Sequence, residues 1–84
     1  MALPHAQAGQ VIELCPLGAA LVAAKTQTLV KTDSLEVIRV VMAAGKTLPP
    51  HAVPGELTVQ CLEGRVEFSV GKSKHLLTSG SFLF

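Results

Sequence analysis

The chain has 84 residues and a nearly balanced charge, with seven Lys+Arg against six Asp+Glu and a formal net charge of +1. There is no basic stripe, and three Phe with no Trp or Tyr leave few platforms for stacking bases, which argues against nucleic-acid binding. At 49% hydrophobic and 15% charged residues, the composition is apolar for a chain that forms one small domain at most, and this favours a buried subunit contact.

The uncharged apolar run Leu14–Ala24 is shorter than the ~20 residues that a membrane-spanning helix needs. It ends in small residues, as a signal peptide does. However, the segment before it carries Glu13 and neither Lys nor Arg, whereas a signal peptide starts with positive charge. We therefore expect a cytoplasmic protein without a membrane segment.

The chain is expected to begin with a flexible lead-in, a short strand and one or two turns of helix. Residues 1–10 have little apolar bulk and contain a proline and a glycine, so they are expected to form a flexible lead-in, followed by a single domain over residues 11–84. Val11–Leu14 has the composition of a short edge strand. Leu17–Lys25 is alanine-rich and predicts one or two turns of helix.

From Thr26 onward the pattern is typical of β-strands. Thr26–Thr32 alternates and is rich in branched residues, and Thr32–Ser34 supplies turn formers. The next strand, Leu35–Met42, is apolar on both faces, which predicts that a second surface, most simply another copy of the chain, covers it. Arg39 is the lone charge on the Leu35-Val37-Val41 side of this strand. It either binds an acidic ligand, pairs with Glu67 across strands, or extends to water.

The second half begins with an irregular, proline-rich connection that carries His51. Leu57, Val59 and Cys61 then alternate with polar residues, and Glu63–Gly64 predicts a tight hairpin turn. The remaining predicted elements, in chain order, are a strand with Val66, Phe68 and Val70 on one face, a turn at Gly71–Lys74, a strand at His75–Thr78 with a solvent-facing His75, a turn at Ser79–Gly80, and a strand at Ser81–Phe84. Short strands at this spacing predict an all-β sandwich or barrel.

The two cysteines do not form the regular framework of a disulfide-rich protein. Cys61 lies inside an apolar alternation, where an unbridged cysteine behaves as a small hydrophobic residue. We expect both Cys15 and Cys61 to be reduced and buried rather than joined in a disulfide.

The segment from Gly45 to Gly64 resembles the first sequence motif of the cupin family, G-x5-H-x-H-x3,4-E-x6-G. Gly45, His51 and Gly64 are in register with that pattern. The second histidine position is Val53, and the glutamate position, counted back from Gly64, is Leu57. The similarity extends over roughly Lys25 to Phe84.

The resemblance implies an antiparallel jelly-roll β-barrel, usually dimeric, with a ligand or metal pocket inside. In cupins a second motif supplies a further histidine from strands that would follow Phe84, so the barrel is expected to lack its C-terminal strands. Of the metal ligands that the resemblance implies, only His51 is retained, because Val53 and Leu57 offer no lone pair. Glu56 lies one residue early, and such a slip turns a strand side chain to the other face.

The candidate pocket residues are therefore His51, Arg39, Val53 and Leu57, and no cofactor is expected, with a divalent metal at His51 as the alternative. His51 either lines the pocket or is a half-exposed loop histidine bonded to backbone. The first function that these residues suggest is a non-catalytic module that binds a small organic molecule and forms a homodimer. A metal-dependent oxygenase or isomerase, and a purely structural dimerisation domain, are the alternatives.

Overall fold

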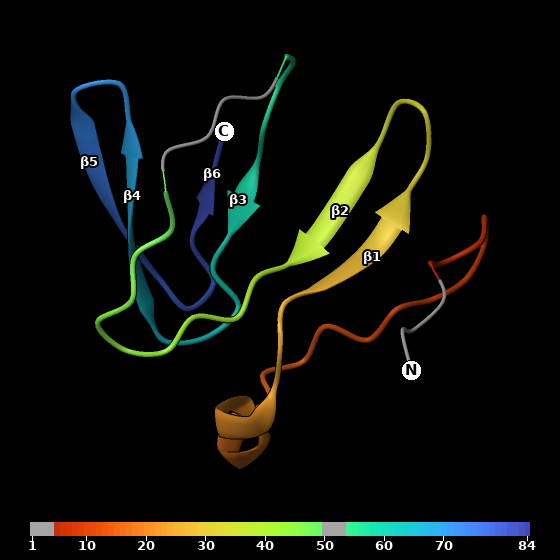
Figure 1. The fold of residues 1–84 in the computed structure, drawn as a ribbon, viewed down its shortest axis with the longest axis horizontal. Coiled ribbons are helices and arrows are strands. Elements are labelled where there is room, and N and C mark those ends of the chain that lie inside the picture. Colours follow the sequence, from red (N-terminus) through yellow and green to blue (C-terminus); the bar gives the residue numbers. More distant parts are fainter. Residues whose placement is uncertain (1–4, 50–53) are drawn as a thin grey trace. The chain divides into compact units, whose positions relative to one another are not determined.

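The computed structural model describes residues 5–49 and 54–84, which are built mainly from strands (Figure 1). The elements in these residues are η1, a 3-10 helix (Gly18–Ala23), β1 (Gln27–Lys31), β2 (Glu36–Arg39), β3 (Val59–Gln60), β4 (Arg65–Val70), β5 (Ser73–Thr78) and β6 (Phe82–Leu83). The strands pair as three two-stranded antiparallel sheets, β1-β2, β3-β6 and β4-β5. The predicted β class and the short N-terminal helical segment are confirmed, and the described strands do not close into a barrel.

Two compact units make up the chain. The first comprises Met1–Glu13 and Leu17–Leu48, and the second Leu14–Pro16 and Pro49–Phe84. Among the described residues, the buried apolar side chains are Leu29 in the first unit and Cys61 and Leu77 in the second. A single domain over residues 11–84 stays a prediction.

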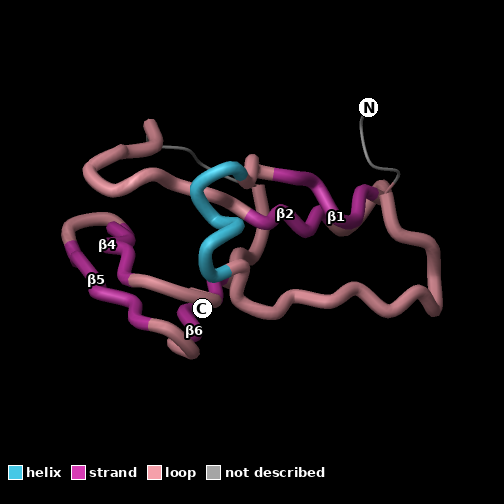
Figure 2. Tube along the Cα trace, turned by 90° about the horizontal axis from the view of Figure 1, so that it is seen from below, coloured by secondary structure: helices cyan, strands magenta, loops and turns pink. Residues whose placement is uncertain are grey.

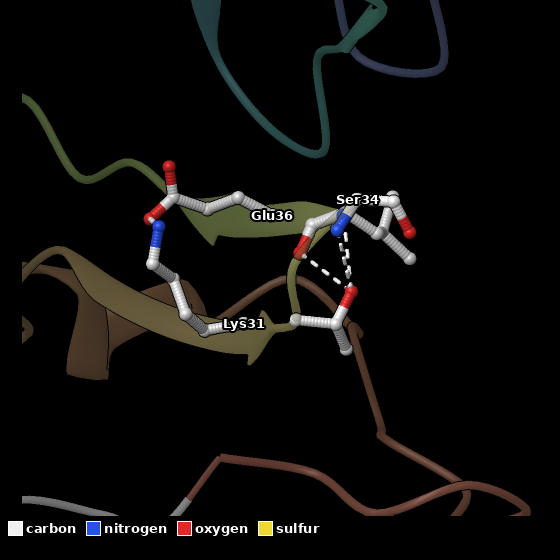
Figure 3. A network of polar contacts seen from close by, with 5 residues as sticks. Lys31, Ser34 and Glu36 are labelled. Atoms are coloured by element: carbon white, nitrogen blue, oxygen red, sulfur yellow. Dashed lines mark hydrogen bonds and ion pairs between the residues drawn. The ribbon is translucent and has the colours of Figure 1, made fainter.

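The β1-β2 hairpin of the first unit turns at the predicted place. Thr32 Oγ1 accepts hydrogen bonds from the backbone N–H groups of Ser34 and Leu35 at 3.3 and 3.0 Å, and the N–H of Thr32 donates to the Leu35 carbonyl at 2.8 Å. An ion pair of 3.4 Å between Lys31 Nζ and Glu36 Oε2 lies beside the turn (Figure 3). The threonine hydroxyl thus bonds turn amides that the strand ladder does not use.

A bulge interrupts β1. Its register with β2 shifts between Thr28 and Val30, so that Leu29 is an extra residue without a direct partner. Leu29 is nevertheless buried, and its carbonyl accepts a hydrogen bond of 2.7 Å from the N–H of Ala6. Residue 6 of the expected lead-in is therefore bonded to the bulge.

Strand β2 is shorter than the predicted strand Leu35–Met42, since it ends at Arg39. Beyond Arg39, the contact between the two segments is made by a side chain, because Thr26 Oγ1 accepts a hydrogen bond from the Val41 N–H at 2.9 Å. Val37 and Ile38 point to opposite faces and are 37% and 44% exposed, so within the described residues neither apolar face is covered as expected.

The expected strand at Val11–Leu14 is not formed. A strand needs a neighbour for its backbone groups, and no described strand pairs with this segment, in which Val11 is 81% exposed. The expected helical turns are present in η1, held by hydrogen bonds such as Ala20 N–H to the Leu17 carbonyl at 3.1 Å. With six residues, η1 is too short to cross a membrane, and no other helix occurs in the described part of the chain.

In the second unit, the sheets β3-β6 and β4-β5 are successive parts of one bent ribbon (Figures 1 and 2). Gln60 pairs with Phe82 and Arg65 with Thr78, so residues 61–64 on one arm face residues 79–81 on the other, and one arm has an extra residue. The hairpin predicted at Glu63–Gly64 is wrong, because β3 pairs with β6 and not with β4. Gly64 has a φ of +78°, a conformation that bulges and hairpin turns both place on glycine.

The ribbon ends in the turn Gly71–Lys72 between β4 and β5. A positive φ of 58° at Gly71, with none at Lys72, defines a type II′ hairpin. His75 lies opposite Phe68 and is half-buried on the same face as Leu77, so the solvent-facing prediction is wrong. Side chains alternate between the two faces of a strand, and the sequence alone does not say which of the two faces is the inner one.

The hydroxyl of Thr32 is expected to stabilise the first unit. The substitution Thr32→Val keeps the shape but leaves the turn amides of Ser34 and Leu35 without their acceptor, and should lower the free energy of unfolding by about 1 kcal/mol. Chemical denaturation followed by far-UV circular dichroism measures this, because the chain has no Trp for fluorescence. Ser34→Ala is the matched control, since Ser34 contributes its backbone N–H; equal losses in both variants would contradict the role of Thr32.

Candidate functional site

The four residues predicted to line a pocket are distributed over both units. His51 and Val53 lie outside the described residues. Arg39 ends β2 in the first unit, and Leu57 precedes β3 in the second. A pocket formed by these four residues therefore stays a prediction.

In the ladder of the first unit, Arg39 lies opposite Gln27, because β2 pairs with β1. Glu67 belongs to β4 in the second unit, and its Oε1 lies 3.9 Å from Lys74 Nζ. A pairing of Arg39 with Glu67 stays a prediction. Arg39 is half-buried at the end of its strand.

Leu57 is the first of three apolar side chains that alternate toward the bend of the ribbon. Its exposed fraction is 46%, Val59 is half-buried and Cys61 is 6% exposed. Alternation places all three on one face. The position where the cupin motif has a carboxylate is thus an accessible hydrocarbon at the outer end of a partly buried apolar row.

Side-chain donors hold the bulge at the bend, which we call the corner (residues 61–64 and 78–81). Cys61 Sγ donates to the carbonyls of Glu63 and Gly64 at 3.5 and 3.7 Å. Ser79 Oγ donates to the carbonyl of Leu62 at 3.1 Å. The Ser79 hydroxyl thus bonds the Leu62 carbonyl, and the carbonyls of Glu63 and Gly64 share the single proton of the Cys61 thiol in a weak bifurcated hydrogen bond.

The opposite arm of the corner is a compact turn. Ser81 Oγ accepts from the Thr78 N–H at 3.1 Å and lies 3.3 Å from Thr78 Oγ1, and the Ser81 N–H donates to the Thr78 carbonyl at 2.8 Å. Cys61 joins the arms, since its N–H donates to the Ser81 carbonyl at 2.9 Å and its carbonyl accepts from Gly80 at 2.8 Å.

Sequence reasoning missed this cluster. Ser79-Gly80-Ser81 stands where the cupin resemblance would place a proline-glycine-aspartate corner, and it was interpreted only as a turn. The signal that was available is the spacing Thr78-x-x-Ser81, which suits a hydroxyl bonded to the backbone of a turn. The contacts of these hydroxyls and of Cys61 Sγ run to the backbone or to each other, so we assign the corner a structural role.

The cysteines differ in environment. No disulfide joins them, as predicted, and Cys61 is buried, as predicted. Cys15 is exposed, which corrects the expectation that both are buried. It precedes Pro16 in a segment without strand or helix.

Within residues 5–49 and 54–84, no group of three or more His, Cys, Asp or Glu side chains is arranged to hold a metal ion. The predicted ligand His51 lies outside these ranges, so a divalent metal at His51 stays a prediction.

Comparisons of the chain with protein-family models, with curated proteins and with solved structures found no match. The cupin resemblance therefore rests on the motif residues of the chain itself.

The corner should contribute measurably to stability. Ser79→Ala removes the donor to the Leu62 carbonyl and should lower the free energy of unfolding by about 1 kcal/mol. Cys61→Ala also empties a buried position, and we expect a loss of roughly 1–3 kcal/mol. Denaturant unfolding followed by circular dichroism tests both. Cys15→Ala, at an exposed site, is the control, and a Cys61→Ala loss no larger than the control's would refute the role of the thiol.

Proposed function

We propose that this chain is a non-catalytic, cupin-like module of the cytoplasm that binds a small organic molecule in an apolar pocket. The observation that carries the proposal is the replacement of metal-binding side chains by hydrocarbon at Val53 and Leu57. Leu57 supports it further, because it is exposed at the end of the apolar row that leads to Cys61. Apolar lining with one or two polar anchors suits small organic ligands.

The bent ribbon supports a jelly-roll barrel as the setting of this pocket. Strands that turn the corners of barrels do so at bulges, and the ribbon of the second unit bends at one. An isolated two-stranded sheet is only marginally stable in water, so each described sheet requires further packing. We propose a barrel as the arrangement that supplies it.

Ligand binding is tested by thermal shift with a library of small apolar molecules that carry one polar group. A ligand at 100 times its Kd should stabilise the protein by about 2.7 kcal/mol, an increase in Tm on the order of 10 °C. His51→Ala and Leu57→Asp should abolish this increase. Leu76→Asp is the control, because Leu76 is exposed on the other face of the ribbon.

A protein that no library member stabilises, or a shift that Leu76→Asp reduces as much as Leu57→Asp, would contradict the proposal.

A structural dimerisation domain is the second candidate, and the apolar hairpin of the first unit favours it. The exposed apolar residues in and beside β2 are Leu35 (55%), Val37 (37%), Ile38 (44%) and Val40 (49%). Burial of such side chains on a second copy removes apolar surface from water at about 25 cal/mol per Å². We therefore propose a homodimer.

Sedimentation velocity over a range of concentrations measures the predicted association. We expect a dimer whose fraction falls on dilution. A monomer that stays folded and unassociated at micromolar concentration would rule out this candidate.

A further inference from the structure

Strand β4 has one edge that no described strand occupies. Within the described residues it pairs with β5 only, over the full length Arg65–Val70. The type II′ turn makes Val70 and Ser73 a hydrogen-bonded pair, and such pairs alternate with non-bonded pairs along an antiparallel ladder. The N–H and C=O groups of Arg65, Glu67 and Ser69 therefore point away from β5, toward the outer edge of β4.

These groups allow a second copy of β4 to pair antiparallel with the first in three short registers. The registers differ in which charged side chains lie opposite each other. A two-fold axis at Glu67 would place two carboxylates opposite each other, which is destabilising. An axis at Phe68 would place Glu67 opposite Ser69 of the second copy. An axis at Val66 places Arg65 opposite Glu67 of the second copy, and does so twice.

We propose that two copies of this chain pair antiparallel along the outer edges of their β4 strands, with the two-fold axis at Val66. The product is a four-stranded sheet in the order β5, β4, β4, β5, held by reciprocal Arg65–Glu67 contacts. This inference goes beyond the proposed ligand binding and does not depend on it. It requires a barrel that stays open along the outer edge of β4, and it is an alternative to the dimer through the β1-β2 hairpin.

Charge and backbone have different roles in this interface. Glu67 and Lys74 form a pair of 3.9 Å with side chains 61% and 72% exposed, and pairs so exposed contribute little affinity. Arg65 of the second copy would give the Glu67 carboxylate a further cation. The charges thus select the register, whereas the backbone hydrogen bonds and the contact between the two Val66 side chains supply the attraction.

The outer edge of β5 is the competing surface. Its outward backbone groups belong to Lys74, Leu76 and Thr78, of which those of Thr78 already bond to Ser81. A two-fold axis at Leu76 would bring together two side chains that are each 64% exposed. No opposite charges meet in that register. Charge complementarity therefore favours β4, and pairing through β5 is an outcome that the test can reveal.

Charge reversal tests the interface. The dimer Kd of the full chain is measured by sedimentation equilibrium at low salt for Arg65→Glu, for Glu67→Arg and for the double variant. Each single reversal should raise Kd about tenfold or more, because it places like charges opposite each other, and the double reversal should return Kd to within about threefold of the parent. Lys72→Glu in the turn is the control and should leave Kd unchanged.

The proposal is overturned if the parent is monomeric, if Arg65→Glu behaves as Lys72→Glu does, or if the double variant associates no better than the single variants. It is also overturned if Leu76→Glu alone dissociates the dimer, which would assign the interface to β5. Circular dichroism of each variant confirms that it is folded.

A second measurement is independent of charge. In a Cys15→Ser background, Val66→Cys should form a disulfide-linked dimer on mild oxidation, because a non-hydrogen-bonded pair on the axis has a Cα separation of about 4.5 Å. Ser69→Cys, away from the axis, should cross-link at least tenfold more slowly. Equal rates for the two variants would contradict the register.

Discussion

Backbone carbonyls at the bend of a two-stranded ribbon must keep hydrogen-bond partners, and the second unit depends on how this is achieved. The extra residue in the arm that contains Gly64 breaks the ladder, and the side chains of Cys61 and Ser79 donate to the carbonyls that the break leaves. Because a lost hydrogen bond lowers stability, a bend without these donors would be less stable than the bend that has them. The thiol of Cys61 thus both donates to backbone carbonyls and fills a buried position.

The core of the described residues is small, and much apolar surface is left exposed. In the described residues the buried apolar side chains are Leu29, Cys61 and Leu77, while many other large apolar side chains remain exposed. Each sheet has two strands, and a two-stranded sheet in water is marginal without further packing. Bound ligand, further strands or a second copy can each supply that packing. The ligand pocket, the barrel and the β4 edge are three proposals that address this one requirement.

The described strands are antiparallel and short, and the ribbon of the second unit bends at a bulge. At the corner, the hydroxyls of Ser79 and Ser81 bond to the backbone, at the positions where the cupin resemblance would place a proline and an acid. The cupin resemblance itself stays a prediction from the motif residues, and hydrocarbon at Val53 and Leu57 is the basis of the function that we propose.

The sequence by itself determined the features that depend on neighbours along the chain. Alternation and turn residues predicted β1, the turn at Thr32, β4, β5 and the helical segment, because side-chain period and turn chemistry are local properties. It also identified the burial of Cys61 and the loss of the ligand side chains at Val53 and Leu57.

Only the tertiary structure decided which strands pair and which face is inward. Glu63–Gly64 has the chemistry of a hairpin turn, yet it lies in a bulge because β3 pairs with β6, about twenty residues away. Val11–Leu14 has no strand neighbour among the described residues, and His75 lies opposite Phe68 in the β4-β5 hairpin, on the same face as Leu77. A positive φ at glycine and period-two alternation fit several strand pairings. Contacts between segments that are distant in the sequence select one of them, and no local pattern contains those contacts.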